Sequence, residues 1–138
     1  MSEEQKKLKA LLVDDDNFLL ELYALKFSKN GYDVVTANGG EDAIAKLEEG
    51  LVPDVMVLDI IMPKMDGLDL LRAIRDKNLI QGVPRIVLSN QGAPSDIRAA
   101  QELGANGYIV KATTIPSEVV AEVGKIYQAT IAAQAANK

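Results

Sequence analysis

Short apolar runs alternate along this chain with longer segments of helical spacing. Five runs rich in Val, Leu and Ile have the length and composition of buried strands, at residues 10–14, 32–37, 54–59, 85–89 and 107–111. The intervening segments repeat apolar side chains every three to four positions, which predicts helices over about 17–29, 40–49, 66–77, 95–103 and 116–135. Strands alternating with helices predict an α/β fold, a doubly wound five-stranded parallel sheet with helices on both faces.

Residue types at the segment ends support these boundaries. Asp16 or Asn17 can cap the first helix. Glycines that can adopt a positive φ follow the first, second and fourth helices, at Gly31, Gly50 and Gly104. Pro116 falls in the first turn of the last helix, where its missing N–H costs little.

Length and composition favour one globular domain over residues 1–138. Hydrophobic residues make up 48% of the chain and charged residues 25%, which separates it from disordered sequences. The net charge of −5 argues against a protein that binds the nucleic-acid backbone. The charged start of the chain is unlike a signal peptide, and no later run is long enough to span a membrane. We therefore expect a cytoplasmic protein with neither nucleic acid nor membrane as a partner.

The chain contains no cysteine and no histidine. This excludes disulfides and thiol chemistry, and it removes the commonest general base and transition-metal ligand. Carboxylates remain as the side-chain metal ligands, and they favour a hard cation such as magnesium, calcium or manganese.

Ionisable and polar side chains stand at the ends of four of the five predicted strands. They are Asp14, Asp15 and Asp16 after the first strand, Asp59 at the third, Ser89 and Asn90 at the fourth, and Lys111 at the fifth. Parallel strands joined by right-handed crossovers end at one edge of the sheet, where open α/β folds bind ligands. We expect these groups to converge there.

Helix capping explains only part of this acidic set. It accounts for Asp16 or Asn17 and for one further Asp, but not for Asp59, which follows the buried run at 54–58. Carboxylates about 4 Å apart repel by roughly 4 kcal/mol at an effective dielectric near 20. Raised pKa values or a bound cation must offset this repulsion, and we favour the cation.

Four motifs in this order resemble the receiver domain of two-component response regulators. They are "LLVDDDN", "VLDIIMPKMDGLDLL", "IVLSN" and "GANGYIVKA", and the resemblance covers about residues 8–130. The spacing from Asp59 to Gly67, with the acidic pair before it and Ser and Lys after it, is the specific part. The resemblance implies a flavodoxin-like sheet of strand order 2-1-3-4-5. It also implies a phosphorylation-driven signalling switch in a phosphorelay, not an enzyme, with self-phosphorylation from small donors and slow autodephosphorylation.

The resemblance also implies roles for individual residues. Asp59 is expected to accept a phosphoryl group from a phosphohistidine on a histidine kinase or phosphotransfer protein. Asp15 and Asp59, with the backbone carbonyl of Ile61, are expected to bind Mg²⁺ directly, and Asp14 to bind it through water. Lys111 is expected to pair with Asp59 before the reaction and with the phosphoryl group after it.

Two further residues are expected to form the switch. Ser89 would hydrogen-bond the phosphoryl group, and Tyr108 would rotate inward with it. The alternatives are a turn hydroxyl for Ser89 and a half-buried strand aromatic for Tyr108. Because we expect no room for an effector domain, output would be either binding to an unknown downstream protein or relay of the phosphoryl group to another histidine-bearing protein.

The chain departs from the family pattern after two strands. Ala112 stands where the family has Pro after the lysine, so we predict a trans peptide between Lys111 and Ala112. Asn90 replaces the small residue after the switch hydroxyl, and Gln91 follows it. We hypothesise that Ile61 and Gln91 tune the lifetime of the phosphoryl group.

The end of the last helix and two rival functions stay open. Apolar residues from Val119 to Ile131 predict a helix that covers the sheet and frays in its Ala-rich end, in a monomer. The alternative is a dimer or partner face, with dimerisation on phosphorylation. The rival functions are a Mg-dependent phosphatase with an Asp nucleophile, which needs a second acid where Ile61 stands, and an interaction module that does not use phosphorylation.

Overall fold

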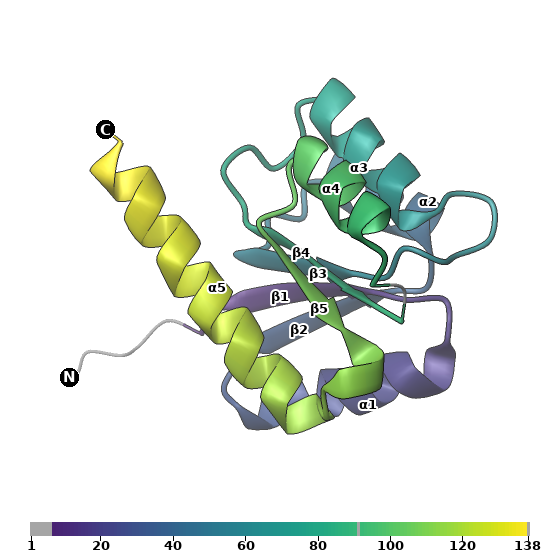
Figure 1. The fold of residues 1–138 in the computed structure, drawn as a ribbon, viewed down its shortest axis with the longest axis vertical. Coiled ribbons are helices and arrows are strands. Elements are labelled where there is room, and N and C mark those ends of the chain that lie inside the picture. The colour runs from purple at the N-terminus through teal and green to yellow at the C-terminus, as the bar shows by residue number, and fades with distance from the viewer. Residues whose placement is uncertain (1–6, 91, 138) are drawn as a thin grey trace.

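The computed structural model describes residues 7–90 and 92–137, which form one five-stranded parallel sheet with helices on both sides (Figure 1). The strands are β1 (Lys9–Val13), β2 (Asp33–Ala37), β3 (Val55–Leu58), β4 (Arg85–Ser89) and β5 (Gly107–Val110). The helices are α1 (Asn17–Lys29), α2 (Gly40–Glu48), α3 (Gly67–Asp76), α4 (Pro94–Glu102) and α5 (Pro116–Ala136), with a short 3₁₀ helix, η1 (Lys111–Thr113). The strand order is β2-β1-β3-β4-β5, as predicted, and each neighbouring pair is parallel.

Each strand supplies side chains to two separate cores, because successive residues of a strand point to opposite faces. In β1, Leu11 and Val13 belong to the core beneath α2, α3 and α4. Ala10 and Leu12 belong to the core beneath α1 and α5. The predicted covering of both faces is therefore confirmed, and it explains why the central strands are apolar at nearly every position.

Local signals fix the helix starts. Asp16 is the N-cap of α1 and its side chain accepts a hydrogen bond of 3.1 Å from the backbone N–H of Leu19. Asp66 caps α3 in a reciprocal arrangement with Asp69, in which each side chain accepts a hydrogen bond from the backbone N–H of the other residue. The cap predicted at Asp16 or Asn17 is thus Asp16.

Three predicted strands end one residue too late. β1 ends at Val13, β3 at Leu58 and β5 at Val110, so Asp14, Asp59 and Lys111 all lie just beyond the sheet. Lys111 instead begins η1, whose turn is closed by a 3.2 Å hydrogen bond from the N–H of Thr114 to the carbonyl of Lys111. The difference has a physical reason. The N–H of Asp14 still bonds the carbonyl of Ala37 and that of Asp59 the carbonyl of Val13, but all three residues lie beyond the last paired positions of their strands, so the pleat no longer fixes the direction of their side chains.

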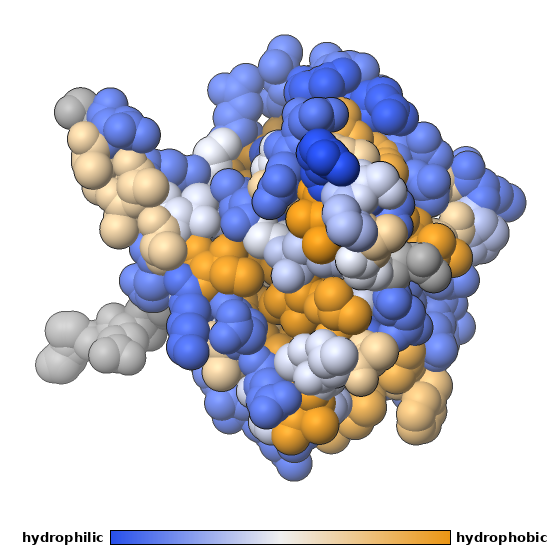
Figure 2. All heavy atoms as spheres, in the orientation of Figure 1, coloured by the Kyte–Doolittle hydropathy of each residue, from blue (hydrophilic) through white to orange (hydrophobic). Residues whose placement is uncertain are grey.

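Helix α5 runs past the sheet and stands out from the body of the molecule (Figure 1). It is helical to Ala136, and Gln134 bonds through Nε2 to the carbonyl of Gly82 at 2.9 Å. The projecting part has the pale colour of weakly hydrophobic residues in Figure 2, in line with its alanines, most of which are exposed. No helix in the described part of the chain combines the length and apolarity needed to cross a membrane.

Candidate functional site

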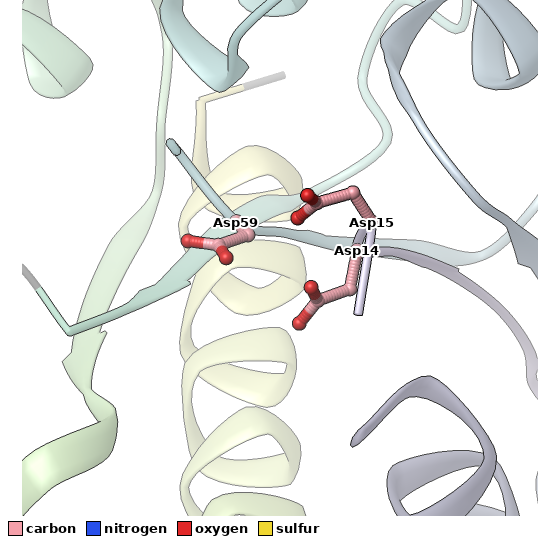
Figure 3. Close-up of side chains that lie close together, drawn as sticks. All are labelled: Asp14, Asp15 and Asp59. Carbon is pink, nitrogen blue, oxygen red and sulfur yellow. The ribbon is translucent and has the colours of Figure 1, made fainter. Parts of the chain in front are cut away.

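The end of β1 carries two adjacent carboxylates. Asp14 leaves 8% of its side chain exposed, whereas Asp15 is exposed. Because β1 stops at Val13, both side chains can turn the same way, and Figure 3 shows their carboxylates reaching toward Asp59. The Asp14 carboxylate is held from its own turn by a 3.0 Å hydrogen bond from the N–H of Asp16.

Asp59 follows β3 in a tightly built turn. Its N–H donates to the carbonyl of Val13 at 3.0 Å, and its Oδ1 accepts from the N–H of Ile60 at 2.7 Å. Only 12% of its side chain is exposed. The first residue of α3 must be a glycine, because a Cβ at Gly67 would overlap the backbone carbonyl of Asp59. The close packing of Gly67 therefore helps to fix the backbone of Asp59.

Lys111, which directly follows β5, contacts both of the largely buried carboxylates. Its Nζ lies 2.8 Å from Oδ2 of Asp14 and 3.4 Å from Oδ2 of Asp59, with 7% of the lysine side chain exposed. Asp14 is thus the closer partner. The resemblance implied the pair with Asp59, but it did not indicate the contact with Asp14, which lies 97 positions from Lys111 in the sequence.

The electrostatics of the three groups are mutually dependent. Burial raises the pKa of Asp59, the Lys111 ammonium lowers it, and the negative charge of Asp14 raises it again, so that the net shift is upward. Burial alone would lower the pKa of Lys111. The hydrogen bond to Asp14 and the charges of both carboxylates outweigh that effect and raise it. The ionised form of Asp59 is therefore electrostatically unfavourable in this site, and a further positive charge nearby would stabilise it.

The three carboxylates suit a hard cation. One oxygen from each of Asp14, Asp15 and Asp59 lies within 4.8 Å of the other two. The donors are all carboxylate oxygens, the ligand type that Mg²⁺ and Ca²⁺ prefer. Their mutual repulsion, relieved for Asp14 and Asp59 by Lys111, is a second reason to expect a divalent ion here.

The two predicted switch residues lie on β4 and β5, the next two strands of the sheet after β3. Ser89, the last residue of β4, is fully buried, and Tyr108 of β5 is half-buried. Burial raises the pKa of Tyr108, the charges of Asp96 and Asp59 add to this, and a hydrogen bond with the Ser89 side chain lowers it. Tyr108 thus lies within electrostatic reach of the acidic site and is linked to Ser89.

Other predicted features are less closely tied to the carboxylates. The Ile61 side chain is 59% exposed, and Asn90 is exposed at the end of β4. Gln91, which we expected to act with Ile61 on the phosphoryl lifetime, lies outside the described residues. The peptide between Lys111 and Ala112 is trans, as predicted.

One residue near the site was not singled out from the sequence. Tyr23 of α1 is buried, and the charges of Lys111, Asp14 and Asp59 all act on its pKa. In the sequence it is one of several apolar and aromatic positions with helical spacing. Its only signal was a hydroxyl on the face of α1 that also carries Leu20 and Phe27.

Comparisons with known proteins agree on one family. The sequence model for the response regulator receiver domain matches residues 10–123. The chain is 36% identical over 118 residues to the alkaline phosphatase synthesis transcriptional regulatory protein PhoP of Bacillus subtilis, covering 86% of this chain and 48% of PhoP. It is 34% identical over 108 residues to the chemotaxis protein CheY1 of Helicobacter pylori strain J99, covering 78% of this chain and 87% of CheY1. The chain therefore spans about half the length of PhoP but most of CheY1.

Solved structures show the same fold. The Vibrio cholerae chemotaxis protein CheY4 superposes with a TM-score of 0.81 at 26% identity, covering 88% of this chain and 99% of that one. A Francisella response regulator receiver domain superposes with a TM-score of 0.78 at 31% identity, covering 90% of this chain and 99% of that one. These similarities cover the sheet and the strand ends at which the carboxylates gather.

Proposed function

The chain belongs to the response regulator receiver domain family, whose members are signalling regulators, and we propose that its phosphoacceptor is Asp59. The observation that carries the proposal is the group of three carboxylates within 4.8 Å, two of which share the buried Lys111. Asp59 is the member that follows the central strand β3, and its Oδ2 contacts the lysine while its Oδ1 is held by the backbone.

The proposed reaction is a nucleophilic displacement at phosphorus. An oxygen of Asp59 forms a bond to the phosphorus of a phosphohistidine on a histidine kinase or phosphotransfer protein. The P–N bond breaks, and its electron pair stays on the imidazole nitrogen, which then takes up a proton. The product is an acyl phosphate, which water can later hydrolyse back to the carboxylate.

Asp15 and Asp59 would hold Mg²⁺ directly with the backbone carbonyl of Ile61, and Asp14 would hold it through water. When bound, the ion offsets the charge of the phosphoryl oxygens and aligns the attack. The carboxylates bring their own repulsion to the site, so binding a cation is favourable before any phosphoryl donor arrives.

Lys111 would change partner during the reaction. In the structure its ammonium bonds Asp14 more closely than Asp59. Once Asp59 is phosphorylated, the phosphoryl oxygens carry the charge that attracts the lysine. Ser89 would then hydrogen-bond a phosphoryl oxygen, and Tyr108, already linked to Ser89, would move inward and alter the surface of α4 and α5.

Phosphorylation would in this way change the binding of a separate downstream protein. The match to PhoP covers about half of that protein, so the full activity of such longer relatives is not carried over to this chain. We propose a monomer that shifts between two arrangements, with phosphorylation favouring one of them.

The proposal is tested by incubating the protein with Mg²⁺ and acetyl phosphate and following its intact mass. We expect a Mg²⁺-dependent phosphorylated species that is lost in Asp59→Asn. Asp54→Asn is the matched control, because Asp54 lies at the opposite end of β3 and its Oδ2 accepts only a backbone N–H from Lys9 among the described residues. Its phosphorylation should equal that of the parent.

The same assay separates the two rival functions. A phosphatase of the Asp-nucleophile kind would release phosphate in many rapid turnovers. It is disfavoured by the apolar, exposed Ile61 at the position where that chemistry needs an acid. An interaction module that does not use phosphorylation would yield no adduct in either protein.

A further inference from the structure

Tyr23 carries a hydroxyl on the apolar face of α1. It lies on α1 with 7% of its surface exposed and belongs to the core between α1, α5 and the sheet. One turn further along the same helix face, Phe27 fills a fully buried position without a hydroxyl. Packing does not require the hydroxyl, because Phe27 fills the neighbouring position of the same helix face without one.

A small cavity links Tyr23 to the acidic site. Its volume is about 10 Å³, and its polar lining consists of Asp14, Tyr23 and Asp59. The remaining walls are apolar side chains of β1, β3, β4 and α1. This volume is at the lower limit for one water molecule, and a buried water needs two to four polar partners, for which Asp14, Tyr23 and Asp59 are the candidates in the lining.

The charges around Tyr23 agree with this location. Burial raises its pKa, the Lys111 ammonium lowers it, and the Asp14 and Asp59 carboxylates raise it. The hydroxyl is therefore within electrostatic reach of Lys111, Asp14 and Asp59, three of the charges that the proposed phosphoryl transfer uses.

We propose that Tyr23 is a positioning residue for the phosphoryl transfer, and that its hydroxyl, through one water molecule in this cavity, holds the Asp14 carboxylate in place. This inference rests on the proposed function, because it assigns Tyr23 a part in that reaction. No covalent change occurs at Tyr23. The hydroxyl donates to the water, and the water donates to Asp14.

The need for such support arises when Lys111 changes partner. Asp14 receives two hydrogen bonds in the structure, at 2.8 Å from Lys111 and at 3.0 Å from the N–H of Asp16. When the lysine turns to the phosphoryl group, Asp14 loses the stronger donor while it remains largely buried. A donor already placed on the core side keeps the carboxylate in position at that moment, so the benefit is greater in the transition state than in the resting site.

The test compares Tyr23→Phe with Tyr32→Phe. Both changes remove only a hydroxyl from a tyrosine that packs in the same core, but Tyr32 contacts Phe27 edge to face at 5.0 Å, and its pKa responds to Tyr127 rather than to the site. With acetyl phosphate at saturating Mg²⁺, we expect Tyr23→Phe to be phosphorylated about tenfold more slowly, as for loss of one hydrogen bond to a charged group. Tyr32→Phe should match the parent.

A second measurement separates positioning from general stability. In an Asp14→Asn background, we expect Tyr23→Phe to cause little further slowing, because the carboxylate through which it acts is gone. A full tenfold loss in that background, or equal rates for Tyr23→Phe and the parent, would overturn the inference.

Two further outcomes complete the test. A high-resolution crystal structure of the parent should contain a water between the Tyr23 hydroxyl and Asp14, and its absence would overturn the inference whether or not the variants fold. A parent protein that takes up no phosphoryl group would instead overturn the proposed function, and this inference with it. A parent that is phosphorylated at a rate independent of Tyr23 would overturn this inference alone.

Discussion

The two ends of the central sheet each contain a partly buried cation, but in opposite surroundings. At the carboxyl end, Lys111 contacts Asp14 and Asp59, and their charges outweigh burial and raise its pKa. At the amino end, burial lowers the pKa of Arg85, with no carboxylate among the causes. Its Nη2 donates to the carbonyl of Ile80 at 2.8 Å, and its Nε is the one buried side-chain polar atom without a partner in residues 7–90 and 92–137.

Charge–charge interactions dominate at the carboxyl end of the sheet, whereas hydrogen bonds to backbone groups dominate at the amino end. At the amino end, Arg85 and Asn106 are joined by two bonds of 2.8 and 2.7 Å that involve backbone groups, and the Asp54 side chain accepts from the N–H of Lys9. These hydrogen bonds do not depend on whether a cation or phosphoryl group is bound at the carboxyl end. At the carboxyl end, two buried carboxylates share one lysine, so their balance changes when a cation or phosphoryl group arrives.

The largest stability effect that would sharpen this comparison is expected for Lys111→Met. The change leaves Asp14 and Asp59 largely buried without their cation, and removing one partner of a buried pair costs about 3–5 kcal/mol. We expect the free energy of unfolding at neutral pH, measured with urea, to fall by about 3 kcal/mol, and Mg²⁺ to restore part of the loss. An unchanged unfolding free energy would show that the lysine does not stabilise the carboxylates.

A smaller effect of opposite sign is expected for Asp59→Asn in the absence of Mg²⁺. Burial and Asp14 raise the pKa of Asp59 above its ordinary value of 3.8, so folding favours the protonated form of this carboxyl. The contribution of Asp59 to stability is therefore complete below that value and is lost as the pH rises through the pKa of the folded state. The variant, which carries no charge, should be more stable than the parent at pH 7 by about 1 kcal/mol.

Unfolding experiments across the acid range check the sign. The advantage of Asp59→Asn should shrink as the pH falls toward 3.8. An advantage that instead grows at low pH would mean that the ionised carboxylate stabilises the fold, and that the carboxyl end does not hold the repulsion described above.

The smallest effect is expected for Arg85→Met at the amino end. The variant loses one hydrogen bond to Ile80 but also removes a buried Nε that has no partner in the described residues. These two contributions oppose each other, so we expect the unfolding free energy to change by less than about 1 kcal/mol. Phosphorylation by acetyl phosphate should be unaffected. A loss as large as that of Lys111→Met would remove the contrast between the two ends.

The sequence was sufficient for the fold because each strand is a distinct apolar run and each helix has a polar or glycine boundary. The gathering of Asp14, Asp15 and Asp59 at one edge was also predictable, since parallel strands place their carboxyl ends together. The strand order itself came from the resemblance to the receiver domain family, because apolar runs do not specify which strands are neighbours.

Other parts of the site depend on distances that no local pattern encodes. The predicted strands included Asp14, Asp59 and Lys111, because sequence propensity does not show where pairing with a neighbouring strand stops. The preference of Lys111 for Asp14 is set by the position of η1 over the sheet edge. Tyr23 was not singled out, because helical periodicity identifies the core-facing positions of α1 but does not show which of them lies near Lys111, Asp14 and Asp59.

The most direct test of the account is to locate the phosphoryl group. After incubation with Mg²⁺ and acetyl phosphate, peptide mass spectrometry of the parent should find the label on the peptide that contains Asp59 and, on fragmentation, on that residue. A label found on Asp14, Asp15 or a residue outside the carboxyl end of the sheet would contradict the assignment of Asp59 as the phosphoacceptor.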